Sequence, residues 1–424
     1  MSVEAAERPQ IHWRKVIALV GGNGLSLAGD FVLLVALSWT AVQIGGAGTV
    51  TAIMLAETLP RALVLIFGGA IADTLGPRMV LLRTTGARFA VLAIGTVIVL
   101  NVHSFWPLLF IAVAEGVLLG LSSPSTGSLM PRLADGDHLA RANSLYGTVL
   151  RLAPIVGAPI GAALIATGRL WVAMVVVTLT CAAQWGTLLY ATKGIERPTV
   201  REGDDSLWRR SGDGLRLLRA NPRLRLMFVS AFCLDLAFGW PLEVALPLIA
   251  DQREWGVAAV GIVVSTFGIG ALASGVLGAM IAHRIPIMIR LIASGVGIAA
   301  GIVLMALMPS VVSLAVASFL VGTMCGLNGP AIVTTYQQAA PKNAMGAAMS
   351  TLSLSGAGTG PFSIALFSGL AFVIGVEVTW IVCGVVALIG PIAALLALRH
   401  PIADEPAPQV ELEAREPALV GAAR

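Results

Sequence analysis

Long apolar runs, separated by short polar clusters, recur along the 424 residues of this chain. We place twelve of them, at 16–40, 49–72, 80–100, 105–126, 143–166, 170–191, 224–249, 257–282, 286–308, 311–335, 344–372 and 377–398. Each approaches or exceeds the roughly 20 residues that a helix needs to cross a bilayer. The short alternating segments of a membrane barrel are not visible. The pattern predicts an all-α polytopic membrane protein with twelve transmembrane helices.

The composition supports this interpretation and excludes several other classes of protein. Charged residues make up 12% of the chain and hydrophobic residues 57%, whereas about a quarter of a soluble protein is charged. No lysine follows a glycine-rich phosphate-binding loop, and the histidines lie outside the predicted spans, so neither ATP hydrolysis nor a metal centre is expected. A membrane-embedded enzyme or receptor would need a nucleophile with its base, or a set of metal ligands, at a common depth in the spans. We therefore expect no enzymatic activity and no cofactor, with a proton gradient as the energy source.

Basic residues give the predicted spans an orientation. If the N-terminus is cytoplasmic, the cytoplasmic side holds 22 of the 27 Lys and Arg residues, which is a strong positive-inside bias. The longest polar stretch divides the chain near its middle. We expect five parts: a cytoplasmic N-terminal segment at 1–15, a six-helix bundle at 16–191, a cytoplasmic linker at 192–223, a second six-helix bundle at 224–398 and a disordered cytoplasmic tail at 399–424.

The two predicted bundles are related to each other. The pattern G-x-x-x-G-L-x-x-P begins at Gly116 in the fourth span and at Gly322 in the tenth, an offset of 206 residues. Shorter matches at nearly the same offset occur in other corresponding spans. A parallel repeat of six helices is a known transporter architecture, with the substrate site between the halves near the bilayer midplane. The repeat predicts such a transporter.

One segment carries a resemblance to a known family. The sequence from Gly69 through Asp73 and Gly76 to Arg78 resembles the signature loop of the major facilitator superfamily, G-x-x-x-D-(R/K)-x-G-x-(R/K)-(R/K). The resemblance implies a cytoplasmic gating loop whose charges latch the outward-open state. Two positions depart from the pattern, because Thr74 and Met79 replace basic residues.

Further motifs point to one branch of that superfamily. Gly157, Pro159 and Gly161 are similar to the motif that marks exporters, although their spacing also suits close helix packing. The sequence around Asp30 and Pro60 looks most like the drug:proton antiporter-3 branch, which includes macrolide and multidrug efflux proteins and a siderophore exporter. The resemblance implies proton-coupled efflux.

Charged residues inside the predicted spans are candidate coupling sites, because burying them is costly. At ~1.5 Å per helical residue, four acids lie near the midplane: Asp30, Glu57, Glu115 and Asp235. Three arginines lie ~12 Å from the cytoplasmic boundary: Arg61, Arg88 and Arg151. A carboxyl group removed from water binds a proton more readily, and a neighbouring arginine opposes this. We expect Asp30 to couple protons, with Asp235 and Glu115 as the next candidates. Alternatively, Arg88 or Arg151 holds Asp30 ionised. Glu57 and Arg61 stand four residues apart on one helix face and suit a static ion pair.

Two uncharged side chains complete the expected cavity. Asn328 could bind substrate or bond a neighbouring helix, and Trp240 precedes a proline that we expect to kink the seventh span. The sequence predicts a monomeric exporter in a bacterial inner membrane, moving small amphipathic compounds against protons. Its partners are substrate, protons and lipid, with no nucleic acid. A siderophore exporter, a lysolipid flippase and a solute importer remain alternatives.

Overall fold

The computed structural model describes residues 13–102, 104–130, 133–134, 136–194, 215–281, 284–341 and 345–400. Most of the predicted N-terminal segment, linker and tail therefore lies outside the described residues, at 1–12, 195–214 and 401–424. Within the described part, every regular element is a helix. The predicted all-α class is confirmed.

The helices fall into two halves. The first half comprises α1 (Trp13–Leu75), α2 (Pro77–Asn101), α3 (Phe105–Leu129), α4 (Gly136–Ile165) and α5 (Leu170–Ala191). The second half comprises α7 (Pro222–Trp240), the π-helix η2 (Pro241–Ala245), α8 (Leu246–Gln252), α9 (Val257–Ile281), α10 (Ile287–Leu307), α11 (Val311–Ala339), α12 (Met345–Ile374), α13 (Val376–Ala387) and α14 (Ile389–Arg399). Eleven described segments are long and apolar enough to cross a membrane. The segment containing α1 is long enough for two spans, which brings the number to the predicted twelve.

The long helix α1 bends where we expected a loop. Gly45 and Gly46 have non-helical backbone angles, with φ 62° at Gly46, and helix resumes directly after them. Two residues thus replace the polar connection expected at 41–48. The predicted signature loop is also shorter than expected, because α1 continues to Leu75 and only Gly76, with φ 83°, precedes α2.

The repeated glycines occupy equivalent contacts in the two halves. A Cβ atom at Gly116 would overlap the backbone oxygen of Glu57, and one at Gly322 would overlap that of Phe267. In both cases the missing side chain lets two transmembrane helices approach at backbone distance. The internal repeat seen in the sequence therefore corresponds to the same helix contact built twice.

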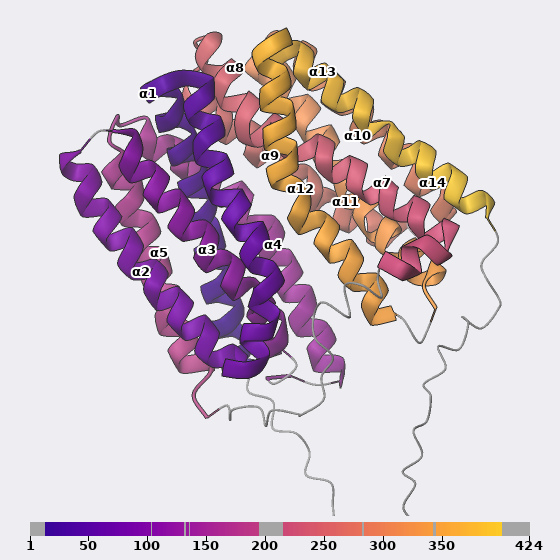
Figure 1. Cartoon of the computed structure of the whole chain (residues 1–424), viewed down its shortest axis with the longest axis horizontal. Helices are drawn as coiled ribbons and strands as arrows, with labels where there is room; N and C mark the ends of the chain where they lie inside the picture. Colours follow the sequence, from indigo (N-terminus) through magenta and orange to yellow (C-terminus); the bar gives the residue numbers. More distant parts are fainter. Residues whose placement is uncertain are drawn as a thin grey trace, which may run out of the picture.

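The two halves lie side by side, with α4 against α9 and α1 against α8 and α12 (Figure 1). We call the end where α5 finishes and α7 begins the linker end, and the end containing Gly45 the far end. At the far end, Gln43 Nε2 donates to Asp251 Oδ1 at 2.7 Å, and Thr51 Oγ1 donates to Ser368 Oγ at 3.0 Å. Side-chain hydrogen bonds therefore join the halves at that end.

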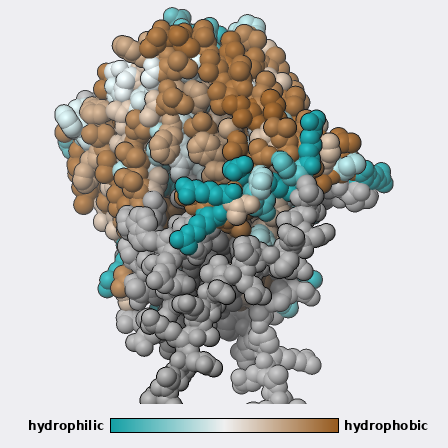
Figure 2. Space-filling model, turned by 45° about the vertical axis from the view of Figure 1, so that its right-hand side comes forward, coloured by the Kyte–Doolittle hydropathy of each residue, from teal (hydrophilic) through white to brown (hydrophobic). Residues whose placement is uncertain are grey.

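The outer surface suits a lipid environment. Figure 2 shows a mostly hydrophobic surface over the helices, with hydrophilic side chains gathered towards one end. Large apolar side chains such as Phe372 and Trp106 are extensively exposed. An apolar surface of this extent would be unfavourable in water and is stable against lipid.

Candidate transport site

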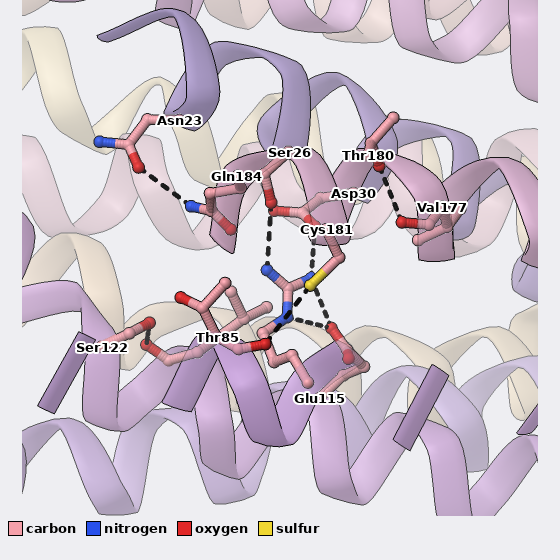
Figure 3. Close-up of polar contacts among 12 residues, drawn as sticks. Asn23, Ser26, Asp30, Thr85, Glu115, Ser122, Val177, Thr180, Cys181 and Gln184 are labelled. Carbon is pink, nitrogen blue, oxygen red and sulfur yellow. Dashed lines mark hydrogen bonds and ion pairs between the residues drawn. The ribbon is translucent and has the colours of Figure 1, made fainter. Parts of the chain in front are cut away.

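An arginine between two carboxylates forms the centre of the first half. Arg88 of α2 points towards α1 and α3, where its Nη2 lies 2.6 Å from Asp30 Oδ1 and 2.6 Å from Glu115 Oε2. Its Nε also donates to Glu115 Oε2 at 2.8 Å. The acids converge from separate helices on one point (Figure 3). The sequence left Arg88 and Arg151 as possible partners of Asp30, and the structure places Arg88 beside it.

The two carboxylates differ in exposure. The Asp30 side chain is 24% exposed, whereas those of Glu115 and Arg88 are 2% and 4% exposed. Glu115 Oε1 is buried and has no hydrogen-bond partner in the structure. With both acids ionised, the three side chains carry a net charge of −1, and one added proton makes the cluster neutral. Asp30 is the most exposed member of the cluster.

Polar side chains from neighbouring helices support this cluster. Arg88 Nη1 donates to Ser26 Oγ at 3.4 Å, one helical turn from Asp30. On the same side of α1, Gln184 Nε2 of α5 donates to Asn23 Oδ1 at 2.9 Å (Figure 3). These bonds connect α1 to both α2 and α5, so the charged cluster lies in a polar layer within the first half.

A second charged group bridges the halves. Glu57 and Arg61 were expected to pair on one face of α1, but the described residues include no ion pair between them. Glu57 interacts electrostatically with Arg61 and with Glu243 of η2, and Glu243 interacts with Arg61. The signal for the position of Glu243 is Pro241, where the expected kink takes the form of a π-helix.

Arg151 lies at the interface of the halves rather than in the Asp30 cluster. A Cβ atom at Gly275 of α9 would stand 2.8 Å from Arg151 Nη1, so the guanidinium of α4 passes over this glycine. Gly268 and Gly261 make similar close approaches to α4 further along α9. Small residues on α9 thus let the two halves meet along α4.

Asp235 differs from the other intramembrane acids. Its side chain is exposed, and the described part of the chain offers it no hydrogen bond or ion pair. Its Oδ2 lies 3.8 Å from the position of a Cβ atom built on Gly356 of α12. One turn along α12, a Cβ atom built on Gly360 would lie 3.9 Å from Thr58 Cγ2 of the first half. Asp235 therefore lies beside the boundary between the halves.

Asn328 and Trp240 are enclosed within the second half. Asn328 Nδ2 donates to Leu291 O at 3.1 Å and to Ser294 Oγ at 2.8 Å, which joins α11 to α10. The Trp240 indole is fully buried, and its Nε1 donates to Ser368 Oγ at 3.0 Å. Both polar groups are used between helices, which for Asn328 is one of the two roles that the sequence left open and for Trp240 differs from the expected place in the cavity.

The remaining motif residues either pack helices closely together or have side chains outside the described part of the chain. A Cβ atom at Gly157 would overlap the backbone oxygen of Ala28, and one at Gly161 would stand 3.0 Å from Val32 Cα, so α4 packs closely on α1. Pro159 lies between these glycines and faces Gly261 of α9. The side chains of residues 66–74, and with them those of Gly69 and Asp73, lie outside the described part.

The gating motif ends within the described residues. Gly76 makes the tight turn between α1 and α2, and Arg78 follows it in the first turn of α2. The positive φ of Gly76 is a conformation that other residues rarely adopt.

Comparison with known proteins agrees with this architecture. A family model described as Major Facilitator Superfamily matches residues 19–363. The multidrug efflux pump Tap of Mycolicibacterium fortuitum is 26% identical over 391 residues, covering 87% of this chain and 92% of that protein. Among solved structures, a peptide transporter POT superposes with TM-score 0.74 at 12% identity, covering 94% of this chain and 99% of the other. The nucleoside transporter NupG gives TM-score 0.68 at 11% identity, with coverage of 90% and 99%. The chain is thus a multi-pass membrane transporter and belongs to the major facilitator superfamily.

Proposed function

We propose that this transporter exports amphipathic drug-like compounds in exchange for protons. The observation that carries the proposal is the unequal exposure of two carboxylates that share Arg88. A partly exposed Asp30 can take up a proton, and the buried Arg88–Glu115 pair then remains neutral. The resemblance to the efflux pump Tap supports export as the direction.

A proton on Asp30 would change the contacts of α1. The protonated carboxyl group no longer attracts Arg88, whose Nε and Nη2 keep their bonds to Glu115. Asp30 lies in the first span of α1, before the bend at Gly45 and Gly46, and the same span carries Gln43, which bonds Asp251 of α8 across the boundary. Release of Asp30 from α2 would therefore act on a span that contacts the other half, which is what alternating access requires.

The expected cell orientation completes the proposal. With both termini in the cytoplasm, the linker end faces inward, and the bacterial inner membrane supplies an inward proton gradient. The Gln43–Asp251 and Thr51–Ser368 bonds would then close the periplasmic side. We propose a monomer, since each chain holds both halves of the transport path, with lipid around it and no cofactor.

The proposal is tested with the Asp30→Asn variant in proteoliposomes. Wild-type protein should accumulate an amphipathic dye against its gradient when a pH difference is imposed, and an internal pH indicator should report proton movement that depends on the dye. The variant should still equilibrate dye across the membrane but lose uphill accumulation by at least about tenfold. The Glu254→Gln variant, which removes an exposed acid at the far end, is the matched control.

Two results would contradict the proposal. Undiminished uphill transport by Asp30→Asn would remove Asp30 from coupling. Proton movement in the same direction as the dye would identify an importer.

A further inference from the structure

One stripe of α7 carries an exposed acid and two aromatic rings. The exposed Asp235 follows Phe228 and Phe232 at the i, i+4, i+7 spacing that aligns side chains on one helix face. The two phenyl rings are stacked, with centroids 6.0 Å apart and planes at 27°. Both rings are half-buried, so each keeps part of its surface open.

The carboxylate on this stripe has no cation of its own. Arg88 and Arg61 interact with acids of other helices, and the described residues provide Asp235 with no ion pair. Cys325 of α11 lies within electrostatic range, and Gly356 of α12 approaches Oδ2 closely, since a Cβ atom built there would lie 3.8 Å away. A charge within the apolar layer is costly without a counter-charge. Asp235 therefore stands where a positively charged ligand group would be favoured.

We propose that Asp235, Phe228 and Phe232 form a subsite for an organic cation that carries an aromatic ring. The cationic group lies against Asp235, and the ring stacks on the phenyl pair about one to two helical turns towards the linker end. Aromatic contact and the carboxylate act on the same ligand, because ring faces attract cations as well as other rings. The subsite rests on the proposed export function and names its substrate class.

Asp30 and Asp235 then have different roles. Asp30 is held by Arg88 and responds to protons, whereas Asp235 is open and holds the charge of the cargo. The two acids lie on opposite halves, on α1 and α7. A ligand bound at Asp235 would occupy the boundary near Gly360 and Thr58, where the halves touch.

The test is equilibrium binding to the purified full-length chain in nanodiscs. The probes are tetraphenylphosphonium, which is cationic at every pH, and triphenylphosphine oxide, which is neutral. The Asp235→Asn variant should weaken the Kd of the cation by about tenfold or more and that of the neutral probe by less than about threefold. Binding of the neutral probe shows that the variant is folded. The Phe232→Leu variant should weaken both probes, and Glu254→Gln should affect neither.

Three outcomes would overturn the subsite: no saturable cation binding by the wild type, an unchanged cation Kd in Asp235→Asn, or equal weakening of both probes. Because binding is measured without a gradient, these outcomes do not depend on coupling. Loss of uphill transport in Asp30→Asn with intact cation binding would support both proposals. Intact cation binding by a wild-type protein that shows no proton exchange would defeat export and leave the subsite standing.

Discussion

The two halves of this transporter share their packing but not their charges. Gly116 and Gly322, 206 residues apart, make the same close contact with a neighbouring helix backbone. At that offset, the buried Glu115 corresponds to Val321, which is also buried. The repeated fold therefore tolerates either a carboxylate or an apolar side chain at this position.

Arg88 follows the same rule. The helices α2 and α10 begin at Pro77 and Ile287, 210 residues apart, and at this second offset Arg88 corresponds to the buried Ile298. At these two positions an apolar side chain of the second half thus replaces a charged side chain of the first. Because a buried ion cluster contributes little net stability compared with apolar packing, we infer that these charges are kept for transport rather than for folding.

The largest effect is expected from removing the shared cation. In Arg88→Met, the carboxylates of Glu115 and Asp30 lose their counter-charge, and Glu115 stays almost completely buried. Breaking a buried pair in this way costs about 3–5 kcal/mol. We expect a strongly lowered unfolding temperature and loss of transport, measured by thermal unfolding in detergent and by dye accumulation in proteoliposomes.

The control variant replaces the whole charged cluster of the first half with apolar side chains. A triple variant with Asp30→Ala, Arg88→Ile and Glu115→Val leaves no charge unpaired. Its unfolding temperature should recover most of the loss, while proton-driven accumulation stays absent. If the triple variant were as unstable as Arg88→Met, the charges would have a structural role and the contrast between the halves would fail.

A smaller loss of stability, similar in the two halves, is expected from substitutions at the repeated glycines. Gly116→Ala and Gly322→Ala each place a methyl group onto a backbone oxygen, which cannot move away as a flexible side chain could. Overpacking of this kind costs about 1–3 kcal/mol. Both variants should lower the unfolding temperature by similar amounts. Gly329→Ala, on the same helix as Gly322 but with open space around it, should not.

The sequence was sufficient for the fold because its signals are local. Apolar runs of bilayer length and the duplicated glycine motif were enough to predict the helices and their parallel repeat. The connections were harder to predict. Gly45 and Gly46 interrupt α1 without a loop, because two backbone angles can turn a helix that composition alone suggests should end.

The charged site could be predicted only in part, because partners depend on helix rotation. Depth along the spans placed Asp30 and Glu115 near the midplane and Arg88 nearer the cytoplasm, and it placed Arg151 at the same depth as Arg88, which left Arg151 as an alternative partner of Asp30. The contact between Arg151 and Gly275 belongs to the interface of the halves, which no pattern within one helix reveals. Spacing at i, i+4 predicted that Arg61 acts on Glu57, but it gave no sign of Glu243, which comes from a distant π-helix.

The smallest effect tests the polar layer of the second half. Asn328 donates to Leu291 O and Ser294 Oγ, and bonds between membrane helices average about 0.6 kcal/mol each. Asn328→Leu should therefore lower stability by about 1 kcal/mol and leave both proton exchange and tetraphenylphosphonium binding within about twofold of wild type. Ser294 Oγ still donates to Arg290 O in the variant, so no buried hydroxyl loses its last partner. A selective loss of ligand binding at unchanged stability would instead place Asn328 in the substrate path, and the second half would then contribute more than Asp235 and its aromatic stripe to recognition.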